Sequence, residues 1–242
     1  MQTTSLLGVL AFGDSITNGG GELQWGVALQ SWAMWTARAL GLPYTGCATD
    51  GARARDVVET QIPALACSSA NPEARYDLGC LYIGVNDVRS FDWDPGEFAS
   101  DFAAALAFLT ARCERTLALT APLDLGRPRA GAKVHELNAA IARLADVHGT
   151  LVVDLADFGA RNHVMVDHVH PTAFGQIAIA QRALAVLAGD GMTVREDPAG
   201  MIRFQTTWWK RLRGDLTYAY RHTKVTGRTL FLQAAHLRSR AP

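Results

Sequence analysis

Short apolar runs alternate with longer amphipathic segments through the first 190 of the 242 residues. The runs typical of strands are 6–12, 44–48, 78–83, 116–120 and 151–154, and helical spacing covers 27–40, 53–65, 95–112, 132–148 and 172–187. Strands that follow one another through a helix are parallel neighbours with right-handed crossovers. The pattern therefore predicts a three-layer α/β/α sandwich with a five-stranded parallel sheet in flavodoxin-like order.

This alternation stops after Gly189-Asp190-Gly191, and a different kind of sequence follows. We expect a catalytic domain over 1–190 and a C-terminal extension over 191–242. From Met192 onward there are ten basic and three acidic residues, so the extension carries about +7 and the domain about −7, because the whole chain is neutral.

The extension also contains aromatic residues, in Trp208-Trp209-Lys210-Arg211 and at Tyr218 and Tyr220. Its charge is opposite to that of the domain, which favours packing on the domain or on a neighbouring subunit of a homo-oligomer. Peripheral contact with an anionic membrane surface is an alternative. Nucleic acid is the least supported partner, since no binding motif accompanies the charge.

The N-terminal segment lacks the basic region of a secretory leader, and its apolar run leads directly into Gly13-Asp14-Ser15. No apolar stretch approaches the roughly 20 residues that span a bilayer. The four cysteines lack metal-site spacing, which is typical of reduced packing residues. We expect a cytoplasmic protein.

Ser15 follows the first predicted strand in Phe12-Gly13-Asp14-Ser15, at the sheet edge where sites of such folds lie. A serine at this point can expose its Oγ while its own N–H faces the same space. The same residues also make ordinary turns and helix caps, so the motif alone leaves both interpretations open.

A carboxylate lies three residues before an imidazole in Asp167-His168-Val169-His170-Pro171. A serine nucleophile needs a base, and the base needs an acceptor that fixes its tautomer. This segment can supply both, although the spacing also suits a capping loop or a metal site. His168 is the competing base, but it directly follows Asp167 and points differently in an extended loop.

Two further loops supply hydrogen-bond donors at the same predicted edge. Asn86 follows the third strand in Gly84-Val85-Asn86-Asp87, and Gly51 follows the second, where a backbone N–H can closely approach a ligand. With the Ser15 N–H they would surround a developing oxyanion. Asp14 and Asp87 are expected to hold their loops through backbone hydrogen bonds.

The ordered set of these motifs resembles the SGNH superfamily of GDSL esterases and lipases over residues 12–175. The resemblance implies Ser15 as nucleophile, His170 as general base and acid, and Asp167 as its partner. It also implies Ser15, Gly51 and Asn86 as the oxyanion hole. Ile16 replaces the motif's leucine, and Cys47 stands where many members have asparagine, which leaves Gly51 the least secure assignment.

The resemblance implies a serine-dependent carboxylic ester hydrolase of the esterase/lipase kind that acts on a small-molecule ester and needs no cofactor or metal. An acyltransferase with the same site and a non-catalytic binding module remain alternatives. Trp25 and the glycines before it either line the substrate pocket or pack in a surface loop.

Overall fold

The computed structural model describes residues 6–22, 27–68, 73–125, 130–202 and 207–238, without the side chains at 68, 225, 226 and 228–238. A five-stranded sheet with order β2-β1-β3-β4-β5 forms the centre, and every neighbouring pair is parallel. The strands are β1 (Val9–Gly13), β2 (Tyr44–Gly46), β3 (Tyr76–Tyr82), β4 (Cys113–Leu119) and β5 (Leu151–Val153). The predicted fold class and strand order are confirmed.

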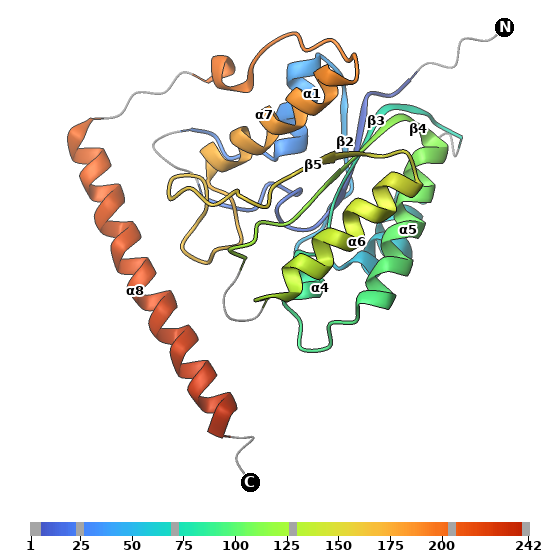
Figure 1. The fold of residues 1–242 in the computed structure, drawn as a ribbon. Coiled ribbons are helices and arrows are strands. Elements are labelled where there is room, and N and C mark those ends of the chain that lie inside the picture. Colours follow the sequence, from blue (N-terminus) through green and yellow to red (C-terminus); the bar gives the residue numbers. More distant parts are fainter. Residues whose placement is uncertain (1–5, 23–26, 69–72, 126–129, 203–206, 239–242) are drawn as a thin grey trace, which may run out of the picture.

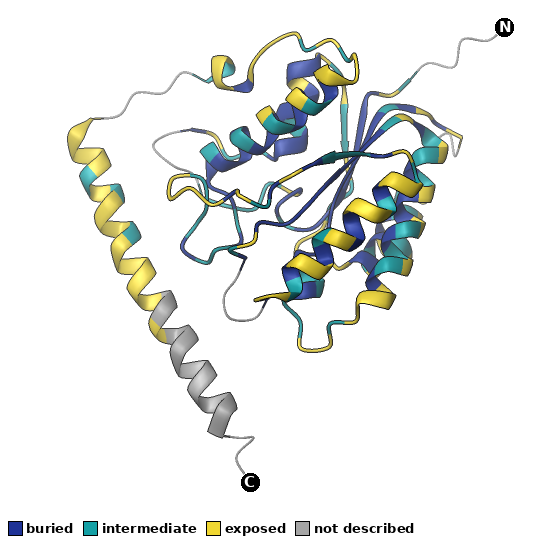
Figure 2. Cartoon of the chain, viewed as in Figure 1, coloured by how far each residue is buried: buried dark blue, intermediate teal, exposed yellow. Residues whose placement is uncertain are grey.

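Helices cover both faces of the sheet (Figure 1). The pair α1 (Trp32–Leu40) and α7 (Ala173–Gly189) packs together on one face, and α5 (Pro95–Arg112) and α6 (Lys133–Val147) pack together on the other. Their inward sides are buried and their outward sides exposed (Figure 2). The shorter helical elements are α2 (Ala54–Asp56), the π-helix η1 (Val57–Gln61), α3 (Ile62–Ser68), α4 (Val85–Val88) and the 3-10 helix η2 (Pro198–Met201).

Two predicted helices differ from those observed. The helix expected over 27–40 begins only at Trp32, because Ser31 caps it by accepting a hydrogen bond from the Met34 N–H. The helix expected over 53–65 is divided by a π-helical turn, which ends at Gln61, two residues before Pro63. Proline has no N–H to donate to the regular α-helical ladder.

The extension contains a long helix that the sequence analysis missed, α8 (Trp208–Arg238). It stands beside the sandwich (Figure 1) and is mostly exposed where its side chains are described (Figure 2). None of the helices in the described part of the chain is both long and apolar enough to cross a membrane.

Gly84 follows β3 as the N-cap of α4 with φ +115°, and a Cβ there would lie 2.8 Å from Leu137 Cδ1 and 3.0 Å from Phe98 Cε2. We expect Gly84→Ala to lower the free energy of unfolding by about 3 kcal/mol, from backbone strain and overpacking together. Gly149→Ala is the control, because Gly149 also has positive φ but open space around it. It should cost only about 1 kcal/mol. Equal losses in urea unfolding would contradict the steric part of this account.

Candidate active site

Ser15, His170 and Asp167 form a continuous chain of hydrogen bonds at the carboxyl edge of the sheet. Ser15 Oγ lies 2.8 Å from His170 Nε2, and His170 Nδ1 lies 2.6 Å from Asp167 Oδ2. With the imidazole proton on Nδ1, the ring donates to the carboxylate and accepts from the serine hydroxyl. This arrangement can remove a proton from Ser15 and stabilise the imidazolium that forms.

The two oxygens of Asp167 have separate roles. Oδ2 contacts the His170 ring, while Oδ1 accepts hydrogen bonds from the N–H groups of Val169 and His170. Burial alone would raise the pKa of Asp167, but these hydrogen bonds together lower it below its ordinary value. Asp167 therefore stays ionised and orients the imidazole at the same time.

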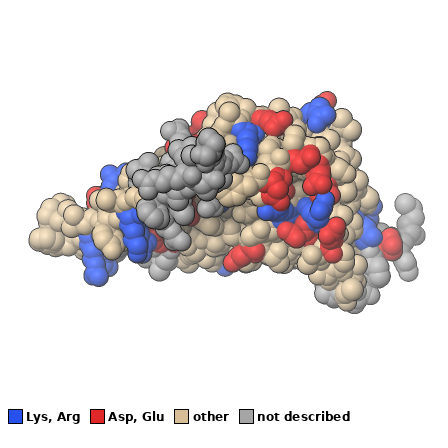
Figure 3. Space-filling view, turned by 90° about the horizontal axis from the view of Figure 1, so that it is seen from below, with Lys and Arg blue, Asp and Glu red and all other residues tan. Residues whose placement is uncertain are grey.

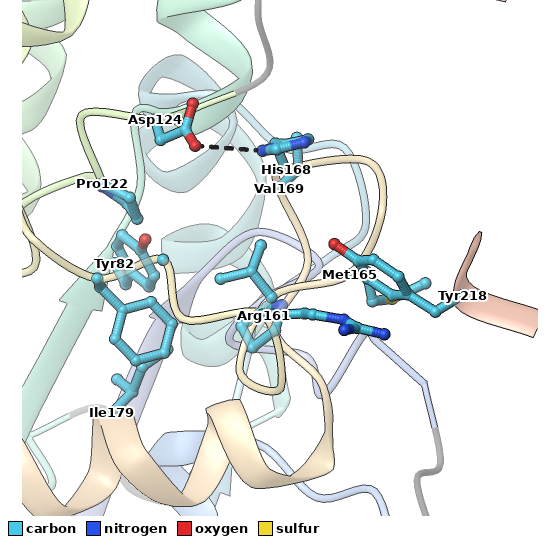
Figure 4. A pocket seen from close by; sticks show the side chains of 13 residues that line it. Tyr82, Pro122, Asp124, Arg161, Met165, His168, Val169, Ile179 and Tyr218 are labelled. Atoms are coloured by element: carbon cyan, nitrogen blue, oxygen red, sulfur yellow. Dashed lines mark ion pairs between the residues drawn. The ribbon is translucent and has the colours of Figure 1, made fainter. Parts of the chain in front are cut away.

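The hydrogen bond that His170 donates to Asp167 raises the pKa of His170 above its ordinary value, although burial of the ring acts in the opposite direction. The competing histidine, His168, points elsewhere. Its Nδ1 lies 3.4 Å from Asp124 Oδ2, in an ion pair drawn in Figure 4. Only His170 of the two contacts Ser15.

Asn86 and Gly51 lie on adjoining loops. Asn86 Nδ2 donates a 3.0 Å hydrogen bond to the Ala52 carbonyl, which fixes the amide against the loop that contains Gly51. The amide keeps a second N–H for a ligand. Gly51 has φ +77° and is exposed, with open space where a Cβ would lie. The glycine is thus favoured by its backbone conformation rather than by crowding.

Asp14 and Asp87 hold their loops by backbone hydrogen bonds, as predicted. Asp14 Oδ1 accepts from the Ile16 N–H, and Asp87 accepts from the Ala54 N–H. Burial raises the pKa of Asp14 to about 7 and that of Asp87 to about 6. Trp25 lies outside the described residues.

Two buried glutamines next to the Ser15 segment escaped the sequence analysis. Gln61, at the end of the π-helix, accepts from the Gly13 N–H and donates to the Gly13 carbonyl and to Thr49 Oγ1. Gln176, in α7, accepts from the Trp32 N–H and donates to the carbonyls of Ile16 and Gly20. One carboxamide thus fixes the chain before Ser15, and the other fixes it after Ser15.

A weak signal for Gln176 exists in the sequence. It lies between the buried Gly175 and Ile177 in a helix that is otherwise apolar on its inner side, and a polar side chain there requires partners. Gln61 has no comparable signal, because its orientation depends on the π-helical turn.

His168, Val169 and Pro171, which flank His170 in the sequence, line a pocket whose walls do not include Ser15 or His170 (Figure 4). Its lining includes Tyr82, Asp124, Phe158, Arg161, His168 and Tyr218, the last of these from α8. Arg161 lies over the Tyr218 ring, 4.8 Å from its centroid. The described residues contain no group of three or more side chains suited to hold a metal ion.

Comparison with known proteins decides the family. The model of the GDSL-like lipase/acylhydrolase family matches residues 11–177. The chain belongs to this family. No curated protein matches the sequence.

Several solved structures share the fold of this chain at low identity. A lipolytic G-D-S-L family protein from Veillonella parvula is 21% identical with a TM-score of 0.60, over 74% of this chain and 97% of that one. Axe2, an acetylxylan esterase from Geobacillus stearothermophilus, is 18% identical with a TM-score of 0.58, over 77% and 96%. The hydrolase LAE5 from the Lake Arreo metagenome is 21% identical with a TM-score of 0.58, over 74% and 94%. These structures show the shared fold, and membership of the GDSL-like lipase/acylhydrolase family supports an esterase-like hydrolase.

The pKa of His170 should depend on Asp167. In Asp167→Asn the negative charge that stabilises the imidazolium is lost, so the pKa of His170 should fall. An NMR titration of the ring would measure this, with Asp124→Asn as the control because Asp124 faces His168 instead. An unchanged His170 titration in Asp167→Asn would contradict the assigned pairing.

Gln61 should act as a positioning residue for Ser15. Gln61→Leu removes the three hydrogen bonds that hold Gly13 and Thr49, so we expect the kcat of ester hydrolysis to fall about tenfold or more with little change in KM. Gln181→Leu is the matched control, because Gln181 is exposed and bonds to Asp197 away from the site. A Gln61→Leu enzyme that loses stability in urea but keeps its kcat would show that the residue serves folding alone.

Proposed function

We propose that this protein is a serine-dependent carboxylic ester hydrolase that forms an acyl-enzyme on Ser15. The observation that supports this most is the hydrogen-bond chain from Ser15 Oγ through the His170 ring to Asp167. A binding module would have no need for a serine hydroxyl, an imidazole and a carboxylate in this order.

In the proposed reaction Ser15 Oγ attacks the acyl carbonyl while His170 Nε2 takes the hydroxyl proton. The N–H groups of Ser15 and Gly51 and the Asn86 Nδ2 amide donate hydrogen bonds that stabilise the negative charge that develops on the carbonyl oxygen. His170 then gives its proton to the leaving alcohol, and the acyl group stays on Ser15. Water, activated by His170, attacks this ester and releases the acid. Asp167 keeps the imidazole oriented throughout.

We further propose that the substrate is an ester of a short-chain acid, with acetyl esters as the first candidates. The support comes from Axe2, which is an acetylxylan esterase by name and shares the fold. Acetylated sugars are therefore the first natural substrates to test, beside aryl esters of increasing chain length. The product to measure is free acid, since transfer to another alcohol would give a new ester.

Replacing the nucleophile tests the proposal. Ser15→Ala should lower kcat for p-nitrophenyl acetate by about 10³-fold or more, because no acyl-enzyme can form. A fluorophosphonate probe should label the wild-type protein and not this variant. Ser100→Ala is the matched control, because Ser100 lies exposed on α5, and it should keep both activity and labelling. Turnover that survives in Ser15→Ala would overturn the mechanism.

A further inference from the structure

The described part of α8 displays an exposed apolar stripe. Trp208, Trp209, Leu212, Leu216 and Tyr220 recur at helical spacing along one side of the helix. Four of these side chains are 64% to 71% exposed, and Leu212 is half-buried. So much exposed apolar and aromatic surface on consecutive turns marks an interaction site.

The opposite side of α8 faces the domain. Asp215 pairs with Arg161, Arg221 pairs with Glu22, and the His222 ring lies 6.4 Å from that of His168. These contacts are polar or aromatic and leave the apolar stripe uncovered (Figures 1 and 2). One side of α8 thus contacts the domain, and the apolar stripe on the other side is exposed.

Positive charge borders the stripe. Lys210, Arg213 and Lys224 share a side of the helix next to it, which we call the basic edge. Residues 207–224 contain five basic residues and one acidic residue. In Figure 3 basic side chains project at the end of the molecule where α8 lies, while acidic ones gather at the other end. A partner for this surface should be apolar in part and negatively charged.

We propose that α8 binds an anionic lipid membrane, with the apolar stripe in the boundary between headgroups and acyl chains and the basic edge on the headgroups. Amphipathic helices with tryptophan on one face and lysine and arginine on the other bind in this way. Each basic residue near such a surface strengthens the binding. Tyrosine and tryptophan suit the boundary because each has an apolar body and a polar tip.

A second copy of this chain is a poorer occupant. Pairing two α8 helices through their stripes would bring two strongly basic segments together, and like charges repel. On the described part of the domain the large exposed apolar side chains are Leu7, Phe91, Leu123 and Val147, which come from four separate segments. These four residues do not form an apolar stripe that could pair with that of α8. The acidic residues on the domain surface are in part already paired, since Arg53 and Arg55 form ion pairs there.

The full chain should be tested by sedimentation with lipid vesicles. We expect binding to phosphatidylglycerol/phosphatidylcholine vesicles, little binding to pure phosphatidylcholine, and weaker binding as salt rises. Leu216→Glu should weaken the binding roughly tenfold or more by placing a charge in the stripe. Val147→Glu is the matched control, because it puts the same charge at a residue of similar exposure on α6. It should bind as the wild type does.

A second variant tests the basic edge. Changing Lys210, Arg213 and Lys224 to Gln should abolish the preference for the anionic vesicles. Absence of wild-type binding at low salt would overturn the proposal, and so would equal losses in Leu216→Glu and Val147→Glu. A dimer in sedimentation equilibrium that Leu216→Glu dissociates, without vesicle binding, would assign the stripe to a second copy instead. Ester hydrolysis in solution measures the proposed enzymatic function separately.

Discussion

The parallel pairing of β1 with β3 is the constraint on which the site depends. Its register sets Gly13 beside Tyr82, so the segments that follow the two strands leave the sheet side by side. The strand order reverses at this point, which is where α/β sheets open a crevice. The segments that contain Ser15 and Asn86 therefore start from the same edge of the sheet, although 71 positions separate the two residues in the sequence. The remaining groups of the site come to this crevice on loops.

Hydrogen bonds to the side chains of Asp167, Gln61 and Gln176 keep those loops in place, and both glutamines are buried. The loop with His170 is fixed by one carboxylate, Asp167, which also faces the imidazole. The segment around Ser15 is fixed by two carboxamides, Gln61 and Gln176. Such hydrogen bonds are stronger in a buried environment, where a backbone group without a hydrogen-bond partner costs free energy. The loops thus gain the rigidity that a reacting group requires although they lie outside the regular elements.

Much of this was predictable from the sequence, because periodicity marks the strands and strand ends mark the site. Ser15, His170 and Asp167 could be paired in advance because their chemistry is complementary and because the ordered set of motifs resembles the GDSL family. The contacts of the two glutamines could not be predicted. The orientation of Gln61 toward Gly13 depends on a π-helical turn, and Gln176 bonds to Ile16, from which 160 positions separate it in the sequence. The helix over 208–238 escaped notice because its stripe lacks the buried partner that usually makes a helical pattern clear.

Gln176 has a consequence for the loop between Ser15 and α1 in this chain. It holds Ile16 and Gly20 on one side of the glycine-rich loop and Trp32 on the other, so both ends of that loop are anchored to a single side chain of α7. The interval between these anchors also contacts the segment that follows His170, because the Ala173 N–H donates to the Glu22 carbonyl and a Cβ at Gly21 would lie 2.3 Å from the Pro171 carbonyl oxygen. A side chain at position 21 would therefore displace the chain next to His170 as well as the loop after Ser15.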